Sequence, residues 1–251
     1  MMDGSTRLLR TYLAEAKYES LRTLRMPAFG IPFLALPVSL YLLLAVLLFG
    51  DAIRGDPHGA VYMFTGFSVM GVMGPGMFGF GVLVALEREQ GLLALKRALP
   101  MPPMAYLLAK MLMAMLFVAI VMATMMLAAP LLGHVTLSAI AFLKIAAITI
   151  LGALPFCAIG LFIGTRTSGK AAPAVTNLLY LAMIYLSGFL IPLPKGVQWI
   201  ALASPAFYLD QLALSAAGAP SHGTTVMHVI VLAGVTLLLT SIAVRRLARV
   251  G

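Results

Sequence analysis

Charged residues are scarce in this chain. Lysine, arginine, aspartate and glutamate make up 10% of its 251 residues, whereas hydrophobic residues make up 62% and the mean hydropathy is +1.04. A soluble domain of this size needs a polar surface that so few charged residues cannot supply. The composition therefore excludes an ordinary soluble domain and predicts an integral membrane protein.

Cysteine is almost absent, and the histidines are scattered. Cys157 is the only cysteine, so there is no disulfide framework and no thiolate metal site, and we interpret it as a small packing residue. His58, His134, His222 and His228 form no set with serine and aspartate, nor a cluster with carboxylates, at membrane depth. We expect no catalytic residue and no metal site.

Ionisable residues are missing from the middle of the apolar stretches. Ion-driven carriers need such groups to bind and release the coupling ion. Residues 164–170 have the G-x-x-x-x-G-K spacing of a phosphate-binding loop, but an apolar stretch rather than a strand precedes them. Ala171 also stands where a serine or threonine would hold magnesium. We interpret this segment as a basic turn and expect no ATP hydrolysis by this chain.

Six apolar stretches are each about as long as a helix that crosses a bilayer. The chain is therefore expected to fold as an all-α protein with six transmembrane helices in one domain, residues 30–251. The stretches cover residues 31–49, 61–86, 104–131, 140–163, 172–191 and 226–244.

The basic residues predict the orientation of these spans. If successive spans alternate in direction, fourteen of the 17 lysines and arginines fall on one side of the membrane. This count assigns Lys110 to the connection after the second span. Only Arg54, Lys144 and Lys195 fall on the other side. Basic residues collect in cytoplasmic connections. The pattern thus predicts an inner-membrane protein with both termini in the cytoplasm, and it argues against nucleic-acid binding despite the net charge of +9.

Residues 1–29 precede the first span and are predicted to form an amphipathic helix at the cytoplasmic membrane surface. Glu19 and Leu21 lie off its pattern, and an ordinary solvated helix or a mobile arm is the alternative. Its apolar side comprises Leu9, Tyr12, Leu13, Ala16 and Leu24, and its basic side comprises Arg7, Arg10, Arg22 and Arg25.

Glycines are concentrated in two spans and predict close helix packing rather than a ligand site. Pro75 is expected to kink the second span, because it lacks a backbone N–H. Gly160 and Gly164 form a G-x-x-x-G pair that is expected to seat another helix. The second span also contains Gly71, Gly74, Gly76, Gly79 and Gly81.

Two polar segments flank the spans. Residues 87–100 follow the second span and predict a short cytoplasmic helix, with alternating charge and several leucines, that docks on a soluble partner. A solvated connector without a partner is the alternative.

Residues 193–218 are too polar to span, and Trp199, Ile200, Phe207 and Leu209 make them amphipathic. We expect short re-entrant helices there that gate an exit.

These segments resemble the type-2 ATP-binding-cassette permease family, and the resemblance covers nearly the whole chain. The family usually has Thr followed by Leu-Glu where Leu92, Leu93 and Ala94 stand here. The residues that carry the resemblance are Glu87-Arg88-Glu89-x-Gly91, Leu93, Pro100 and Lys110, then Ser187-Gly188-Phe189, Pro192, Trp199, Ser204-Pro205, Tyr208 and Asp210.

The resemblance implies the membrane subunit of an ATP-driven exporter. Two permease halves, identical or related, would form a path lined by spans one, two and five, surrounded by membrane lipids. Separate ATPase subunits would bind ATP and magnesium, so this chain needs no cofactor. The implied residues are Glu87, Arg88, Glu89, Gly91 and Leu93 for coupling, Tyr62, Phe64, Phe67, Tyr180, Tyr185 and Phe189 for the path, and Trp199, Phe207, Tyr208 and Asp210 for an outer gate.

Two other functions remain as alternatives. One is a self-contained carrier or channel, and the other is a membrane scaffold or sensor that transports nothing. The sequence does not choose among a drug, a lipid, a lipid-linked sugar and a peptide as cargo.

Overall fold

A computed structural model describes residues 4–50, 56–98, 103–133, 135–188 and 198–250. Every regular element in these ranges is a helix, which confirms the all-α prediction. In chain order they are α1 (Gly4–Leu24), α2 (Pro27–Tyr41), η1 (Leu42–Leu48), α4 (Pro57–Gly74), η2 (Pro75–Val82), α5 (Leu83–Glu89), α6 (Leu92–Ala98), α7 (Pro103–Leu132), α8 (Ala139–Leu151), α9 (Ala153–Gly164), α10 (Ala172–Ser187), η3 (Gln198–Ala203), α11 (Pro205–Ala217) and α12 (Thr225–Val250).

Five continuous helices within the described ranges are long and apolar enough to cross a membrane. The predicted fifth span is shorter, because α10 has 16 residues and ends where Gly188 adopts a left-handed conformation. At 1.5 Å per residue such a helix extends about 24 Å, less than the hydrocarbon core of a bilayer. The five long helices are Gly30–Leu48, His58–Glu89, Ala105–Leu132, Ala139–Gly164 and Thr225–Leu247.

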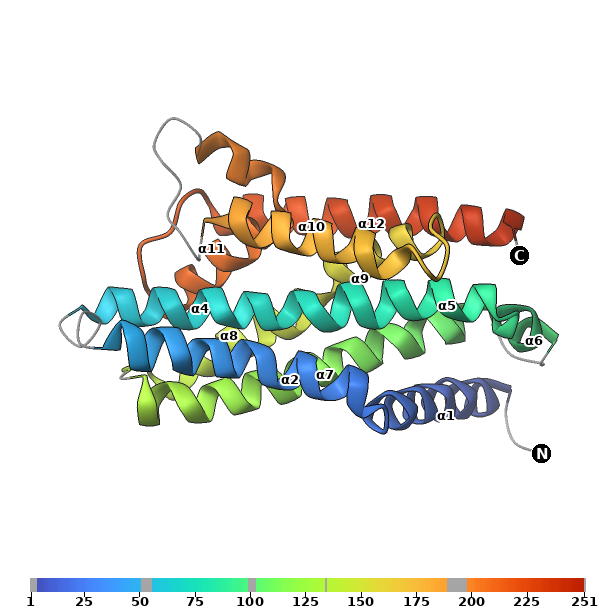
Figure 1. Cartoon of the computed structure of the whole chain (residues 1–251), viewed down its shortest axis with the longest axis horizontal. Coiled ribbons are helices and arrows are strands. Elements are labelled where there is room, and N and C mark those ends of the chain that lie inside the picture. Colours follow the sequence, from blue (N-terminus) through green and yellow to red (C-terminus); the bar gives the residue numbers. More distant parts are fainter. Residues whose placement is uncertain (1–3, 51–55, 99–102, 134, 189–197, 251) are drawn as a thin grey trace.

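The long helices lie side by side in an elongated bundle (Figure 1). The continuous rod formed by α4, η2 and α5 runs through its middle, with α2 and α7 below it and α10 and α12 above it in this view. At one end lie α1, α6 and the C-terminus, and at the other end lie α11 and η3. The basic segments therefore gather at one end of the bundle, as expected from alternating spans.

Glycines bring the second and fourth spans into close contact, and this confirms the predicted role of the G-x-x-x-G pair. A Cβ atom on Gly81 would lie 2.5 Å from the Gly160 carbonyl oxygen, and one on Gly160 would lie 2.7 Å from the Met77 carbonyl oxygen. Gly164 faces the carbonyl of Gly81 equally closely. Because backbone atoms cannot yield, only glycine fits this crossing.

Pro75 begins a π-helical segment, η2, within the second span. Proline has no N–H to donate to the preceding turn, and a wider helix is one way to accommodate that loss. The helix continues on both sides of η2, so the second span passes through this segment without interruption.

The N-terminal helix α1 packs along α7, and its buried side is polar. Glu19 and Thr23 are buried, and Tyr12 and Ala16 are half-buried. Leu13, by contrast, is 62% exposed. The residues expected on the apolar side are thus divided between the contact with α7 and the outer surface. The side of α1 that packs on α7 contains the acidic Glu19, whereas Leu13 faces outward.

Candidate functional site

Three fully or almost fully buried charged side chains meet where α1, α5 and α7 converge. The Lys110 ammonium lies 2.5 Å from Glu19 Oε1 and 3.1 Å from Glu87 Oε1. Lys110 is 0% exposed, Glu87 1% and Glu19 4%. Buried charges at this depth are tolerated only when they are paired and hydrogen-bonded, so each of these three residues depends on the others.

Two further groups complete the coordination of Glu87. The Tyr106 hydroxyl donates to Glu87 Oε2 at 2.5 Å, and the Arg22 guanidinium donates to Oε1 at 2.7 Å. Burial works against the charge of Arg22, but the Glu87 hydrogen bond and the neighbouring carboxylates raise its pKa above the ordinary value. Both oxygens of Glu87 are therefore satisfied from within the protein.

Lys96 connects the short helix α6 to the same cluster. Its ammonium lies 2.6 Å from Glu15 Oε1, 3.7 Å from Glu19 Oε2 and 4.7 Å from the centre of the Tyr106 ring. The cluster thus joins α1, α5, α6 and α7, with three acids and three bases. We call these residues the ionic cluster: Glu15, Glu19, Arg22, Glu87, Lys96, Tyr106 and Lys110.

Sequence reasoning missed this cluster. The count of basic residues assigned Lys110 to the connection after the second span, although the predicted third span, residues 104–131, contains it; in the structure it lies inside the helix Ala105–Leu132 and is fully buried. Two signals were available: the position of Lys110 within an apolar stretch, and Glu19 lying off the amphipathic pattern of its helix. Neither signal identifies the residue with which the charge is paired, because Glu19 and Lys110 are 91 positions apart in the sequence.

The residues expected to couple to an ATPase occupy different environments. Glu87 points into the ionic cluster and is buried. The Arg88 guanidinium donates to the carbonyls of Thr165 and Thr167, at 2.5 and 2.6 Å, and so fastens the predicted basic turn after α9. Glu89 is exposed at the end of α5.

The predicted short helix begins at Leu92 rather than at residue 87. Gly91 has a φ of +74°, a left-handed conformation that ends the second span and separates it from α6. Leu93 is buried, whereas Leu95 is 63% exposed. The prolines at 100 and 102 lie outside the described residues, and Pro103 is the first residue of α7.

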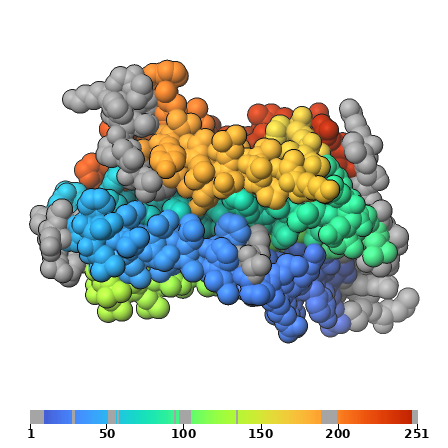
Figure 2. All heavy atoms as spheres, in the orientation of Figure 1, coloured from blue at the N-terminus to red at the C-terminus, as the bar shows by residue number. Residues whose placement is uncertain are grey.

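A pocket of about 240 Å³ lies between α2, the second span and α10. The first, second and fifth spans are the ones that the family resemblance assigns to the path. On the face shown in Figure 2, α2 (blue) and α10 (orange) flank the second span. The wall of this pocket is largely apolar, and Asn177 contributes its one side-chain amide. The wall consists of Pro32, Phe33, Leu36, Pro37, Met70, Gly71, Gly74, Phe78, Asn177 and Tyr180.

Of the aromatic residues expected along the path, Tyr180 lines this pocket. Phe64 and Phe67 lie in the core instead, less than 2% exposed and edge-on to the ring of Tyr41. Helix packing encloses both rings, and neither lines this pocket. Tyr185 is 54% exposed, and Phe189 lies outside the described residues.

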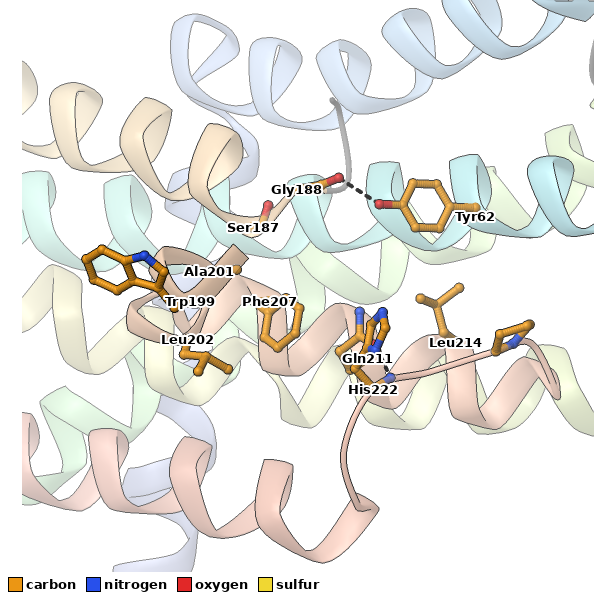
Figure 3. A pocket seen from close by; sticks show the side chains of 11 residues that line it. Tyr62, Ser187, Gly188, Trp199, Ala201, Leu202, Phe207, Gln211, Leu214 and His222 are labelled. Atoms are coloured by element: carbon orange, nitrogen blue, oxygen red, sulfur yellow. Dashed lines mark hydrogen bonds between the residues drawn. The ribbon is translucent and has the colours of Figure 1, made fainter. Parts of the chain in front are cut away.

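A second pocket, of about 390 Å³, is lined in part by η3 and α11 (Figure 3), at the end of the bundle opposite α1 and α6 (Figure 1). The Tyr62 hydroxyl donates to the Gly188 carbonyl at 2.6 Å, and the His222 amide donates to Gln211 Oε1 at 2.7 Å. Trp199 and Phe207, two of the residues expected at an outer gate, supply its aromatic walls. The pocket therefore combines aromatic surface with neutral polar groups.

The other two predicted gate residues, Tyr208 and Asp210, do not line this pocket. Tyr208 is buried and donates to the Leu202 carbonyl at 2.9 Å. Asp210 is 1% exposed, and one of its carboxylate oxygens has no hydrogen-bond partner among the described residues. Burial raises the pKa of Asp210 to about 7, although a hydrogen bond with Thr65 partly offsets that rise. Asp210 is thus a buried acid that titrates near neutral pH.

The family of the chain follows from comparison with known proteins. The family model of the ABC-2 type transporter matches residues 11–216, which include the ionic cluster, the first pocket and most of the residues that line the second. The chain belongs to the ABC-2 type transporter family. It is also 26% identical over 204 residues to YvfS of Bacillus subtilis (strain 168), a protein named as a candidate transport permease, with 80% of this chain and 81% of that protein covered. The chain is therefore an ABC-2 transporter permease, an integral membrane protein of transport.

Proposed function

We propose that this permease is the membrane subunit of an ATP-driven exporter, powered by separate ATPase subunits that dock at the end of the bundle formed by α1 and α6. Family membership supports a permease with a separate ATPase. The proposed orientation places both termini in the cytoplasm, on the basis of the basic residues gathered at this end.

The observation that carries the coupling proposal is the ionic cluster. It ties α6, through Lys96, to two acids of α1, and it ties α1 and α5 to Lys110 of the third span. A displacement of α6 therefore transmits to two membrane spans through the partly buried pair of Lys96 with Glu15 and the buried pairs of Lys110, rather than through a loose loop. Glu89, Gln90 and Leu95 are exposed next to the Gly91 turn, and we propose that they contact the ATPase.

We propose that cargo passes along the pocket between α2, the second span and α10, facing a second permease half. Its wall is rich in aromatic and aliphatic groups and offers the Asn177 amide as a hydrogen-bonding group. Such a wall fits an uncharged, largely apolar cargo with few polar groups. Trp199 and Phe207, at the second pocket, are proposed to gate the exit.

Coupling is tested by co-expressing the permease with its ATPase and measuring nucleotide-dependent transport in proteoliposomes. Leu95→Glu places a charge on the exposed docking surface of α6, and we expect ATPase binding to fall at least tenfold and transport to stop. Ser221→Glu adds the same charge at an exposed position in the connection before α12, at the opposite end of the bundle, and serves as the matched control. Equal ATPase binding by both variants contradicts the proposed docking surface.

The same preparation distinguishes an exporter subunit from a self-contained carrier. The proposal requires that transport stop when nucleotide or the ATPase is omitted. Cargo movement by the isolated permease, without nucleotide, would establish the carrier instead.

A further inference from the structure

An apolar groove of about 400 Å³ lies between the fourth span, α11 and α12, away from both pockets already described. Hydrocarbon side chains form nearly all of its surface, among them Ile148, Leu151, Leu212, Val229, Ala233 and Leu237. Its volume falls within the range of about 300–1,000 Å³ that is usual for ligand sites.

The groove opens on the outer surface of the bundle. Leu151 is 59% exposed and Leu237 is 69% exposed, and both belong to helices long enough to cross the membrane. The contents of the groove are therefore in contact with the hydrocarbon of the bilayer. An elongated apolar chain fits such a surface better than a polar solute does.

Lys144 lies on the same face of α8, one helical turn before Ile148. A separation of four residues, or of seven as for Leu151, places side chains on one side of a helix. Lys144 is the sixth residue of α8 and is exposed, inside the candidate span Ala139–Gly164. No acidic side chain of the described ranges pairs with it.

A lysine at this depth extends its ammonium toward the headgroup layer. Its charge complements a lipid phosphate, and the groove begins one turn away along the same helix face. We propose that this permease binds one anionic glycerophospholipid here, with an acyl chain in the groove and the phosphate on the Lys144 ammonium. This site is separate from the proposed cargo path.

The proposal is tested by native mass spectrometry of the full-length permease in detergent, titrated with phosphatidylglycerol or with phosphatidylcholine. Wild type is expected to retain one phosphatidylglycerol more tightly than phosphatidylcholine. Lys144→Gln should weaken phosphatidylglycerol binding about fivefold, because one lysine near an anionic lipid surface contributes about 1 kcal/mol. Lys170→Gln, at another exposed lysine, is the control for charge and should leave binding unchanged.

Ala233→Trp fills the groove and should reduce the binding of both lipids, since it removes the acyl site. Leu238→Trp adds an indole to an exposed position of α12 outside the groove and should have no effect. Equal binding of the two lipids by wild type, or undiminished binding by Lys144→Gln or Ala233→Trp, would overturn the proposal. Dissociation of a permease dimer by Ala233→Trp would instead identify a second copy of the chain as the occupant.

Discussion

Lys110 holds two carboxylates together at the end of the bundle. Its ammonium lies between Glu19 and Glu87, and Tyr106 and Arg22 satisfy the remaining acceptor sites of Glu87. The interior position of Lys110 makes this arrangement costly to disturb, because a buried carboxylate that loses its partner retains its desolvation penalty.

Lys110→Met should lower the free energy of unfolding by about 3–5 kcal/mol, the usual effect of removing one partner from a buried ion pair. Glu19→Gln combined with Lys110→Met should restore part of that loss, because it removes one of the two stranded carboxylates. Unfolding in mixed micelles with increasing dodecyl sulfate measures both variants. An unchanged midpoint for Lys110→Met would mean that the ion pairs contribute nothing.

Asp210 makes the stability of the permease depend on pH. Its folded pKa, about 7, lies above the ordinary value of 3.8, so the fold favours the protonated form. This contribution is complete below about pH 4 and is lost as the pH rises to 7.

Asp210→Asn should therefore raise the thermal midpoint by several degrees at pH 8, since about 1 kcal/mol corresponds to about 2–4 °C for a chain of this size. The difference from wild type should shrink steadily below pH 7 and vanish near pH 4. Circular dichroism of the two proteins in detergent between pH 4 and pH 8.5 measures this trend. A difference that does not vary with pH would exclude titration of Asp210 as its cause.

At the scale of elements, packing between the second and fourth spans was predictable, whereas the ionic cluster was not. Gly160 and Gly164 predicted a close crossing by their spacing alone, and Gly81 is the partner that the structure supplies. Helix periodicity describes one element at a time, so it could not pair Glu19 of α1 with Lys110. The family resemblance assigned Phe64 and Phe67 to a path, and the sequence alone could not show that they lie in the core, because an apolar helix has the same pattern whether it faces a cavity or the core.

Gly160→Leu should prevent the second and fourth spans from approaching and abolish a folded, monodisperse permease. Even its Cβ would lie 2.7 Å from the Met77 carbonyl oxygen and 2.9 Å from that of Gly76. Gly234→Ala is the matched control, because no atom lies within 4 Å of the added methyl group, and its effect should stay within about 1 kcal/mol. Gel filtration in detergent compares the yields. A normal yield of Gly160→Leu is the contrary result.

At the scale of the whole molecule, the bundle has two chemically distinct ends. The ionic cluster and the basic segments occupy one, and the neutral polar pocket with Trp199 occupies the other. This polarity agrees with the arrangement that the distribution of lysine and arginine predicts, and it gives the proposed orientation a direct test.

Cys157 is fully buried, so the natural chain provides a low background for labelling with a thiol reagent. Lys170→Cys, near the end that carries α1, should react with a membrane-impermeant maleimide only after cells are permeabilised. Ser221→Cys, in the exposed connection before α12, should react in intact cells. The reverse pattern would invert the topology and remove the ATPase docking proposal with it.

The order in which the ribosome makes the ionic cluster has a consequence for membrane insertion. Glu15 and Glu19 leave the ribosome long before Lys110, and Glu87 follows while both are still without that cation. The net charge of the cluster reaches zero only when Lys110 is synthesised as part of the third span. Nascent chains that stop short of Lys110 should therefore keep α1 undocked and open to proteases, so the third span governs when the N-terminal helix becomes part of the fold.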